Sequence, residues 1–448
     1  MEIIFRPDPS IWDGRFANNG WLQELPKPVS KLTWDNAAQL SPATAAQLGL
    51  ATGDIVDINT GGRKVSAPVL VVPGQADGTV IATLGYGRVT NFRVATPEFD
   101  ARAPFGIGEN RTRTPLGFNA YALRTSQAPH FLGGTQLAKT GTAYKMAITQ
   151  GHFRLEGRKE DIAPSGTLEQ FTQNEEFLHG EGHHEVLSLF PPYEYTGYAW
   201  GMSIDLSVCT GCNACTVACQ AENNISIVGK EQVWRGREMH WIRIDQYFEG
   251  SENDPRIANQ PMLCQHCELA PCEIVCPVAA TSHDTEGLNV MTYNRCVGTK
   301  YCSNNCPYKV RRFSYLQYGY MDRSDDDYQN RPKSLRLMYN PDVTVRSRGV
   351  MEKCTFCLQR ISEARIEAEK ANRQIADGEV ITACQQVCPT QAIVFGNIND
   401  PNAAVSKLKA EPTTYGALPE LNTKPRVTYM ARLRNLNPAL GSAENETE

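Results

Sequence analysis

Fifteen cysteines in four segments constrain this chain more than any other feature of its sequence. Two segments carry four cysteines each, with the spacings C-x2-C-x2-C-x3-C and C-x2-C-x4-C-x3-C. A third carries three, and the fourth joins a C-x2-C pair to a distant C-x3-C pair. In order, the segments contain Cys209, Cys212, Cys215 and Cys219; Cys264, Cys267, Cys272 and Cys276; Cys296, Cys302 and Cys306; and Cys354, Cys357, Cys384 and Cys388. Such spacings are typical of loops that bind cubane iron–sulfur clusters. The pattern predicts four clusters and a path for electrons.

The alternatives to iron–sulfur clusters fit this pattern poorly. Iron in a cubane cluster takes one soft thiolate ligand per corner, and a tight C-x2-C-x2-C loop supplies three of them. Structural zinc uses separated C-x2-C pairs and does not explain a third and fourth cysteine in one loop. No C-x2-C pair is followed by His, which disfavours attached haem, and the recurring x2 spacing is equally unlike a disulfide framework.

Thr299 stands where the C-x2-C-x2-C-x3-C template expects the second cysteine of the third segment. A threonine hydroxyl is a hard, weakly acidic oxygen and a poor ligand for iron. We therefore expect a [3Fe–4S] cluster at this segment. The alternative is a four-iron cluster with water or hydroxide at the corner that lacks a thiolate.

Length and charge limit the other possibilities. The 448 residues favour two or three domains, and a formal net charge of −5 argues against a nucleic-acid partner. No stretch approaches the roughly 18 apolar residues that suggest a membrane-spanning helix. The start, MEIIFRPDPSIWDGRF, lacks the apolar segment of a signal peptide. Because it opens directly on strand-like residues, we expect the sequence to begin inside a larger protein.

Residues 1–135 are predicted to be rich in β-strands. Residues 54–60 alternate at period two, and turns at Gly61-Gly62 and Pro73-Gly74 lead into strands at 64–72 and 78–84. A short helix precedes them, with Ser41 as N-cap and Pro42 at its first position, and it ends at Gly49. We expect a double-psi-like β-barrel with one helical excursion.

The rest of the chain divides into three parts. Residues 136–195 are polar and irregular and are predicted to form a linker. Residues 196–400 hold every cysteine and a helix expected at 355–373. Residues 401–448 have few apolar residues, and we expect an extended tail that binds along a partner. The predicted fold class is α+β.

The cysteine segments resemble a known family. The stretches WGMSIDLSVCTGCNACTVACQAEN, CQHCELAPCEIVCPVAAT and CVGTKYCSNNCPYKVRRF resemble the four-cluster iron–sulfur subunits of the dimethyl-sulfoxide-reductase family. The resemblance implies two fused ferredoxin-like halves, in which the first segment pairs with the fourth and the second with the third. It implies three [4Fe–4S] sites and one [3Fe–4S] site, held respectively by Cys209, Cys212, Cys215 and Cys388; by Cys219, Cys354, Cys357 and Cys384; by Cys264, Cys267, Cys272 and Cys306; and by Cys276, Cys296 and Cys302.

The first zone carries a second resemblance. The stretch DGRFANNGWLQELPKPVSKLTWDNAAQLSPATAAQLGLATGDIVDI resembles the C-terminal, dinucleotide-binding barrel domain of molybdopterin oxidoreductases. Its fusion to a four-cluster module resembles the B subunit of alternative complex III, a bacterial quinol-oxidising complex. That resemblance implies no molybdenum cofactor and no substrate site or catalytic residue in this chain. It implies a position on the periplasmic face of the inner membrane.

The same resemblance implies function and partners. Electrons would pass from quinol, oxidised in an integral-membrane subunit, through the clusters toward multihaem and monohaem cytochrome c subunits. The remaining molybdopterin oxidoreductase-like region would be another partner. One alternative is the iron–sulfur subunit of a molybdenum-dependent sulfoxide or polysulfide reductase. A scaffold that uses its clusters only for folding is the other, and four clusters are many for that role.

Three further sets of residues attract attention. His266 lies between Cys264 and Cys267, and we expect it to make a hydrogen bond or packing contact that tunes a cluster. His183 and His184 are expected to be solvated. The run 309–312, with Lys309, Arg311 and Arg312, is first interpreted as a solvated face, with a docking patch or a positive field near a cluster as alternatives.

Overall fold

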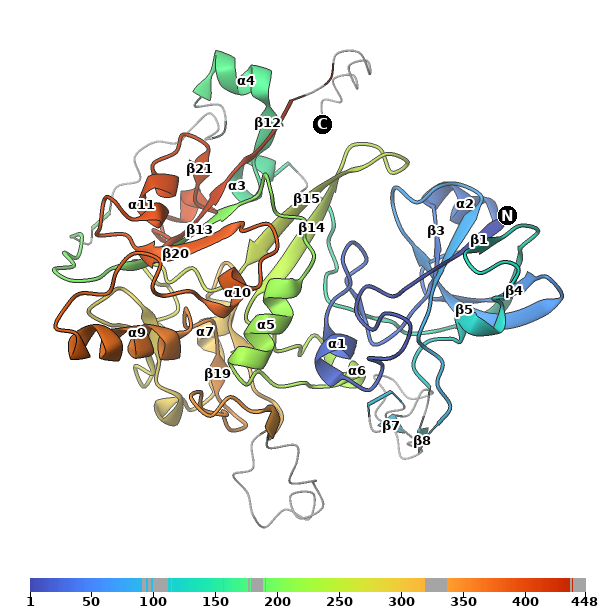
Figure 1. Cartoon of the computed structure of the whole chain (residues 1–448), viewed down its shortest axis with the longest axis horizontal. Helices are drawn as coiled ribbons and strands as arrows, with labels where there is room; N and C mark the ends of the chain where they lie inside the picture. The colour runs from blue at the N-terminus through green and yellow to red at the C-terminus, as the bar shows by residue number, and fades with distance from the viewer. Residues whose placement is uncertain are drawn as a thin grey trace, which may run out of the picture. The chain divides into compact units, whose positions relative to one another are not determined.

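The computed structural model describes residues 1–90, 94–95, 98–99, 112–113, 115–155, 157–175, 178, 188–189, 191–318, 337–435 and 437. His183 and His184 lie outside the described residues. The chain forms two compact units (Figure 1). Unit 1 comprises Met1–Phe153, Ile227–Glu238 and Tyr247–Ile257, and unit 2 comprises Arg154–Ser226, Met239–Gln246 and Ala258–Glu448. The predicted α+β class is confirmed.

Unit 1 is built on a seven-stranded sheet with the strand order β10-β4-β5-β3-β6-β1-β9. Strands β1 and β6 are parallel, as are β3 and β5, whereas β4 pairs antiparallel with β5 and with β10. The strands are β1 (Glu2–Arg6), β3 (Ala38–Leu40), β4 (Asp54–Thr60), β5 (Arg63–Val71), β6 (Thr79–Thr83), β9 (Phe131–Leu132) and β10 (Gln136–Ala143). Alternate residues of β4, Val56 and Ile58, are fully buried in the core of this unit.

The local predictions for this sheet are confirmed. Strands β4, β5 and β6 lie within one residue of the expected ranges at both ends. Helix α2 (Pro42–Gln47) begins after Ser41, whose Oγ accepts the N–H of Thr44 at 3.0 Å. Gly49 follows the helix with a φ of +62°, a conformation that glycine adopts without strain.

The structure differs from the expectation of a linker that begins at residue 136. Strand β10 (Gln136–Ala143) pairs with β4, and β11 (Ala147–Ile148) pairs with β2 (Leu32–Thr33), so both belong to unit 1. The residues of β10 are mostly exposed because it is an edge strand, and its polar sequence therefore lacks the apolar alternation of a buried strand. The other elements of unit 1 are α1 (Gly20–Glu24), β7 (Glu98–Phe99), β8 (Thr112–Arg113), the 3-10 turn η2 (Ala120–Ala122) and α6 (Lys230–Trp234).

Unit 2 contains a four-stranded sheet with the order β20-β13-β22-β21. Its strands are β13 (Trp200–Asp205), β20 (Ile393–Asn397), β21 (Thr414–Tyr415) and β22 (Val427–Met430). The central strand β13 ends just before the first cysteine segment, and β20 begins just after the last one. The sheet therefore joins the segment containing Cys209 to the segment containing Cys388, which are far apart in sequence.

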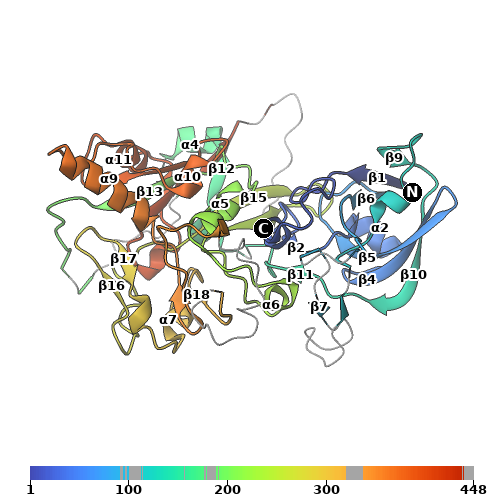
Figure 2. The ribbon, with the colours of Figure 1, turned by 60° about the horizontal axis from the view of Figure 1, so that its bottom comes forward.

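Short helices and hairpins surround this sheet (Figure 2). Helix α9 (Leu358–Lys370) confirms the helix expected at 355–373, and Ile361 and Ala364 are buried on one face of it. The hairpin of β14 (Arg243–Glu249) and β15 (Arg256–Met262) has its base in unit 2 and its tip in unit 1. The remaining elements are α3 (Lys159–Ile162), β12 (Ser165–Thr167), α4 (Leu168–Gln173), α5 (Ala214–Glu222), β16 (Thr281–His283), β17 (Asn289–Met291), η4 (Tyr293–Arg295), α7 (Tyr301–Asn304), β18 (Arg312–Phe313), β19 (Met351–Glu352) and α10 (Ala383–Gln386).

The predicted extended tail is folded over most of its length. Strand β22 pairs in parallel with β13, and Val427 and Tyr429 are fully buried. The other elements here are α11 (Ala404–Lys409), η6 (Pro419–Leu421) and β23 (Arg432–Arg434). Residues 438–448 lie outside the described part of the chain. The alternation of apolar and polar residues in β22 could have revealed this strand.

Candidate metal centres

Two cysteine loops of unit 2 follow the same backbone path. In the first, Gly211 and Asn213 have φ values of +67° and +65°, and α5 begins immediately afterwards. In the second, Gly298 and Lys300 have φ values of +73° and +61°, and α7 begins immediately afterwards. The repeated conformation agrees with two related halves.

Thr299 occupies in the second loop the position that Cys212 occupies in the first. Each is preceded and followed by a residue with positive φ, and both side chains are exposed. The backbone conformation therefore supports the alignment of Thr299 with a cysteine position, as the sequence does. The loop retains its conformation but presents a hydroxyl instead of a thiol.

The fifteen cysteines can be followed as four groups, each named after its first member. None of the fifteen, all of which the structure describes, forms a disulfide. The Cys209 group is Cys209, Cys212, Cys215 and Cys388; the Cys219 group is Cys219, Cys354, Cys357 and Cys384; the Cys264 group is Cys264, Cys267, Cys272 and Cys306; and the Cys276 group is Cys276, Cys296 and Cys302.

The structure brings the members of the Cys209 and Cys219 groups close together. Burial raises the pKa of the Cys215 thiol, and the thiols of Cys384, Cys209, Cys212 and Cys388 raise it further. Burial also raises the pKa of Cys219, together with Cys354, Cys357 and Cys384. Helix α5, which carries Cys215 and Cys219, packs against α10, which carries Cys384. The first and fourth segments therefore meet.

The second and third segments meet in the same way. Burial raises the pKa of Cys267, and Cys264, Cys306 and Cys272 act in the same direction. Burial raises the pKa of Cys302, and Cys296 and Cys276 add to this effect. All four groups thus bring together cysteines from two segments. Single metal ions need tighter sets, and no three His, Cys, Asp or Glu side chains in the described ranges converge closely enough to hold one.

The groups also lie next to one another in a consistent order. Cys384 raises the pKa of Cys215 as well as that of Cys219. The Cys209 and Cys219 groups are therefore neighbours. Cys264 raises the pKa of Cys354, which links the Cys219 and Cys264 groups. Cys276 lies four residues after Cys272 in the sequence, so the Cys264 and Cys276 groups are neighbours.

Backbone N–H groups point at cysteine sulfurs at equivalent places in the two halves. The N–H of Ala280 lies 3.2 Å from Sγ of Cys276, and the N–H of Ala392 lies 3.3 Å from Sγ of Cys388. Such hydrogen bonds favour thiolate over thiol, and they are a normal feature of iron–sulfur sites. Backbone N–H groups lower the pKa of Cys276 enough to outweigh its partial burial. These residues fit an iron–sulfur cluster.

His266 is buried and lies between two cysteine loops. Its Nδ1 accepts the backbone N–H of Asn289 at 3.0 Å, and its ring stacks on Phe356. Burial lowers the pKa of His266 well below its usual value, and Lys353 adds to this effect, so the ring is neutral. With Nδ1 accepting, Nε2 carries the proton. That these contacts of His266 tune a cluster stays a prediction.

The run 309–312 differs from the first interpretation, a solvated face. Lys309 is exposed and Arg312 is half-buried, but the side chain of Arg311 is enclosed, with 5% of its surface exposed. Val310 and Arg311 are both buried, and the run leads into the short strand β18. Asn289, which contacts both His266 and Arg311, was not predicted, and no signal in the sequence distinguishes it.

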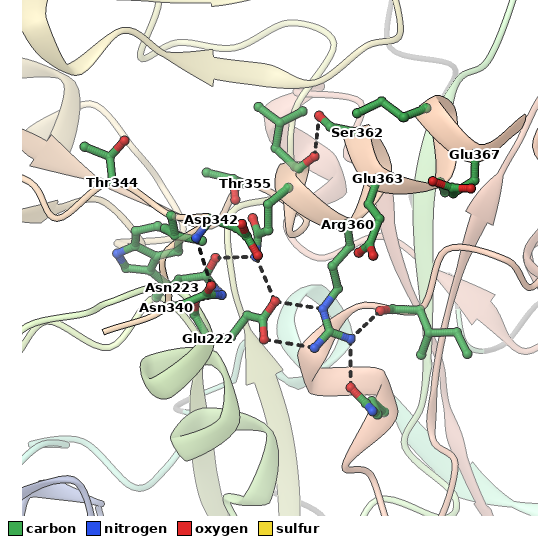
Figure 3. A pocket seen from close by; sticks show the side chains of 18 of the residues that line it. Glu222, Asn223, Asn340, Asp342, Thr344, Thr355, Arg360, Ser362, Glu363 and Glu367 are labelled. Carbon is green, nitrogen blue, oxygen red and sulfur yellow. Dashed lines mark hydrogen bonds and ion pairs between the residues drawn. The ribbon is translucent and has the colours of Figure 1, made fainter. Parts of the chain in front are cut away.

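A cavity of about 1110 Å³ lies beside the Cys219 group (Figure 3). On its wall, Glu222 at the end of α5 forms a paired contact with Arg360 of α9, with oxygen–nitrogen distances of 2.8 and 2.9 Å. Asn223 lines the same cavity, and its Nδ2 lies 3.6 Å from Sγ of Cys219. The cavity therefore reaches close to one cysteine group.

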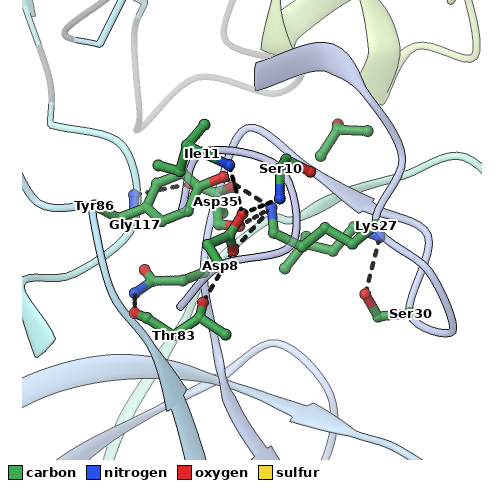
Figure 4. Close-up of polar contacts among 12 residues, drawn as sticks. Asp8, Ser10, Ile11, Lys27, Ser30, Asp35, Thr83, Tyr86 and Gly117 are labelled. Carbon is green, nitrogen blue, oxygen red and sulfur yellow. Dashed lines mark hydrogen bonds and ion pairs between the residues drawn. The ribbon is translucent and has the colours of Figure 1, made fainter. Parts of the chain in front are cut away.

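Unit 1 buries a separate set of charged side chains around Asp8 and Asp35 (Figure 4). Lys27 lies 3.7 Å from Asp8 and donates to the hydroxyl of Tyr86 at 2.8 Å. Asp35 pairs with Lys230 at 2.7 Å. These groups satisfy one another, as buried charges must. They do not form an open binding site, so we derive no step through a pterin dinucleotide.

Glycines of unit 1 serve close contact between backbone segments. A Cβ on Gly85 would lie 2.6 Å from the backbone nitrogen of Gly14. The space beside Gly85 is therefore filled by the chain itself and does not form a cradle for a phosphate group.

Comparison with known proteins agrees with this division. Residues 18–103 match the molybdopterin dinucleotide binding domain, and residues 208–280 and 256–320 each match a 4Fe-4S dicluster domain. The iron–sulfur cluster-binding subunit of menaquinone reductase from Nitratidesulfovibrio vulgaris is 38% identical over 240 residues, which cover 52% of this chain and 89% of that protein.

The chain belongs to the iron–sulfur subunit family of molybdopterin-type oxidoreductases.

Two other relatives match a similar share of this chain. Iron–sulfur subunit 1 of the Hdr-like menaquinol oxidoreductase of Archaeoglobus fulgidus is 33% identical over 51% of this chain and 82% of its own length. The putative dimethyl sulfoxide reductase iron–sulfur subunit of Halobacterium salinarum is 33% identical over 52% of this chain and 78% of its own length. The family match thus accounts for about half of the chain. None of the helices that the structure describes has the length and apolar character needed to span a membrane.

Proposed function

We propose that the chain is the electron-transfer subunit of a membrane-associated quinol oxidoreductase of the alternative complex III type. The observation that carries this proposal is the row of four adjacent cysteine groups, one of which has Thr299 at a ligand position. The groups would bind three [4Fe–4S] clusters and one [3Fe–4S] cluster, which accept and release single electrons. The chain's own residues would position the clusters and place backbone N–H donors beside them, as at Cys276 and Cys388.

The Cys276 group is the proposed entry point for electrons. A cluster that has lost one iron usually has a higher potential, which suits the first acceptor of electrons from quinol. Electrons would then pass through the Cys264, Cys219 and Cys209 groups, in the order in which these groups adjoin. The proposed partners are an integral-membrane quinol-binding subunit, the remaining molybdopterin oxidoreductase-like region and cytochrome c subunits. The proposed location is the periplasmic face of the inner membrane.

Two relatives support the quinone chemistry, because their names refer to menaquinone reductase and to menaquinol oxidoreductase. Other relatives support a second candidate, the iron–sulfur arm of a molybdenum-dependent reductase. These are a putative dimethyl sulfoxide reductase subunit and an arsenate respiratory reductase subunit. The match of residues 18–103 to a molybdopterin dinucleotide binding domain is compatible with both candidates.

Metal analysis of the intact complex, purified from membranes, tests the proposal. We expect about fifteen iron atoms per chain and an EPR signal of a three-iron cluster in the oxidised state. Quinol should reduce the clusters, and molybdenum should be absent. Stoichiometric molybdenum with pterin would favour the second candidate. Clusters that no quinol reduces would contradict the proposal.

A further inference from the structure

Arg311 places a buried positive charge between two cysteine groups. Its Nη2 donates to Oγ1 of Thr281 at 2.7 Å and to Oδ1 of Asn289 at 2.8 Å, and its Nη1 lies 3.8 Å from Sδ of Met291. All three acceptors are electrically neutral. Among the described residues, no carboxylate forms an ion pair with Arg311. An enclosed guanidinium without a countercharge is costly, so a negative partner is expected nearby.

The residues that hold the guanidinium lie beside cysteines of two groups. Nδ2 of Asn289 lies 4.0 Å from Sγ of Cys272, and the N–H of Ala280, the neighbour of Thr281, lies 3.2 Å from Sγ of Cys276. Burial lowers the pKa of Arg311, but Cys272, Cys264, Cys302 and Cys306 together raise it above its usual value. Arg311 therefore lies within electrostatic reach of both the Cys264 group and the Cys276 group.

The guanidinium is held in this position by one hairpin. Thr281 lies in β16, and Asn289 and Met291 lie in β17, with Thr281 and Met291 paired across the hairpin. Asn289 is fixed in turn, because its backbone N–H donates to His266 and its Oδ1 also accepts from Thr281 at 3.2 Å. The charge therefore has a defined location and is not free to move toward solvent.

We propose that Arg311 raises the reduction potentials of the two clusters bound by the Cys264 and Cys276 groups. The proposal rests on the proposed function, since it assumes clusters at these groups. A reduced cluster carries one more negative charge than an oxidised one, and a fixed cation nearby stabilises that state. The effect is strongest on the buried side of these groups, where Cys264, Cys272 and Cys302 lie, because the interior screens charges less than solvent does. By favouring reduction of the Cys276 group, Arg311 would help this end of the chain to accept electrons.

Redox titration of the intact complex, followed by EPR, tests this role. Arg311→Gln should shift the midpoint potentials of two clusters, including the three-iron cluster, to more negative values and leave the other two unchanged. Arg311→Lys keeps the charge and should stay close to wild type. Arg312→Gln is the matched control, since Arg312 is adjacent but donates to the backbone oxygen of His240 at 3.2 Å, and it should shift none of the four.

Iron content separates the possible failures. If Arg311→Gln retains all clusters and all four potentials match wild type, the role of Arg311 is refuted while the proposed function stands. Equal shifts in Arg311→Gln and Arg311→Lys would also refute it, because they would indicate a structural cause. If Arg311→Gln loses clusters, Arg311→Met supplies the test. It removes the charge but keeps an unbranched side chain in the enclosed site, and it should lower the same two potentials. Unchanged potentials in this variant would overturn the proposal.

Discussion

The ring of His266 stacks on the ring of Phe356, with centroids 3.9 Å apart and planes inclined by 20°. Each residue stands two positions after the first cysteine of a C-x2-C pair, and each has a positive φ, 45° for His266 and 53° for Phe356. The stack therefore joins equivalent positions of two loops. These loops belong to the Cys264 and Cys219 groups. The two groups are also neighbours, because Cys264 raises the pKa of Cys354.

Removing one ring should loosen both loops. Phe356 is 1% exposed, so Phe356→Ala leaves a cavity between the Cys264 and Cys219 groups and should cost about 3–5 kcal/mol of stability. We expect cluster loss at lower guanidinium concentration, monitored by visible absorbance. Phe131→Ala is the control, because Phe131 is 62% exposed and its loss should change stability by less than about 0.5 kcal/mol. Equal effects of the two substitutions would contradict a structural role for the stack.

Restoring the missing thiolate should change the cluster type. Thr299 lies in a loop with the backbone conformation of the Cys212 loop, so Thr299→Cys places a thiol where a fourth ligand is needed. We expect the three-iron EPR signal of the oxidised complex to disappear and the iron content to rise by about one atom per chain. Thr299→Ser, which keeps a hydroxyl, should retain the wild-type signal. A wild-type complex without any three-iron signal would refute the assignment.

The stability of unit 1 should fall as pH rises from about 4.5 to about 8. Burial raises the pKa of Glu24 to about 8, although its carboxylate accepts the N–H groups of Val228 and Gly229. The folded protein therefore keeps the Glu24 carboxyl protonated at pH values where the unfolded chain has already released this proton. This difference favours folding at low pH. The loss is on the order of 3 kcal/mol by pH 7. Thermal unfolding from pH 5 to 8.5 should show this decline in wild type and a smaller one in Glu24→Gln. Parallel curves would contradict the prediction.

Gly287 and Gly378 offer a matched pair of substitutions. Both have a φ of +78°, so alanine costs about 1–2 kcal/mol of backbone strain at either position. A Cβ on Gly287 would overlap the guanidinium of Arg426, whereas one on Gly378 meets nothing within 4 Å. Displacing Arg426 breaks its ion pair with Glu268 and should cost roughly 1.5–3 kcal/mol more. Guanidinium denaturation of the two variants measures this difference, and equal midpoints would show that Arg426 adapts freely.

Local sequence signals were sufficient to predict an element where its structure depends only on residues within the same segment. The alternation in 54–60, the cap at Ser41 and the helix expected at 355–373 are confirmed by β4, α2 and α9. The polar edge strand β10 gave no such signal, because its pairing with β4 is made through the backbone and leaves its side chains exposed. Strand β22 has only four residues, and the Pro and Asn residues around it give this part of the chain the composition of an irregular tail.

The sequence by itself determined that the cysteines are spaced as ligands of iron–sulfur clusters. Cysteine spacing and the substitution at Thr299 are local properties, since the ligands of a tight loop are set by the few residues that separate them. Tertiary structure alone decided that Arg311 is enclosed and that His266 faces Phe356. These properties depend on contacts between residues far apart in the chain. Burial then changes the energy of a charge or a thiol by amounts that its sequence neighbours do not reveal.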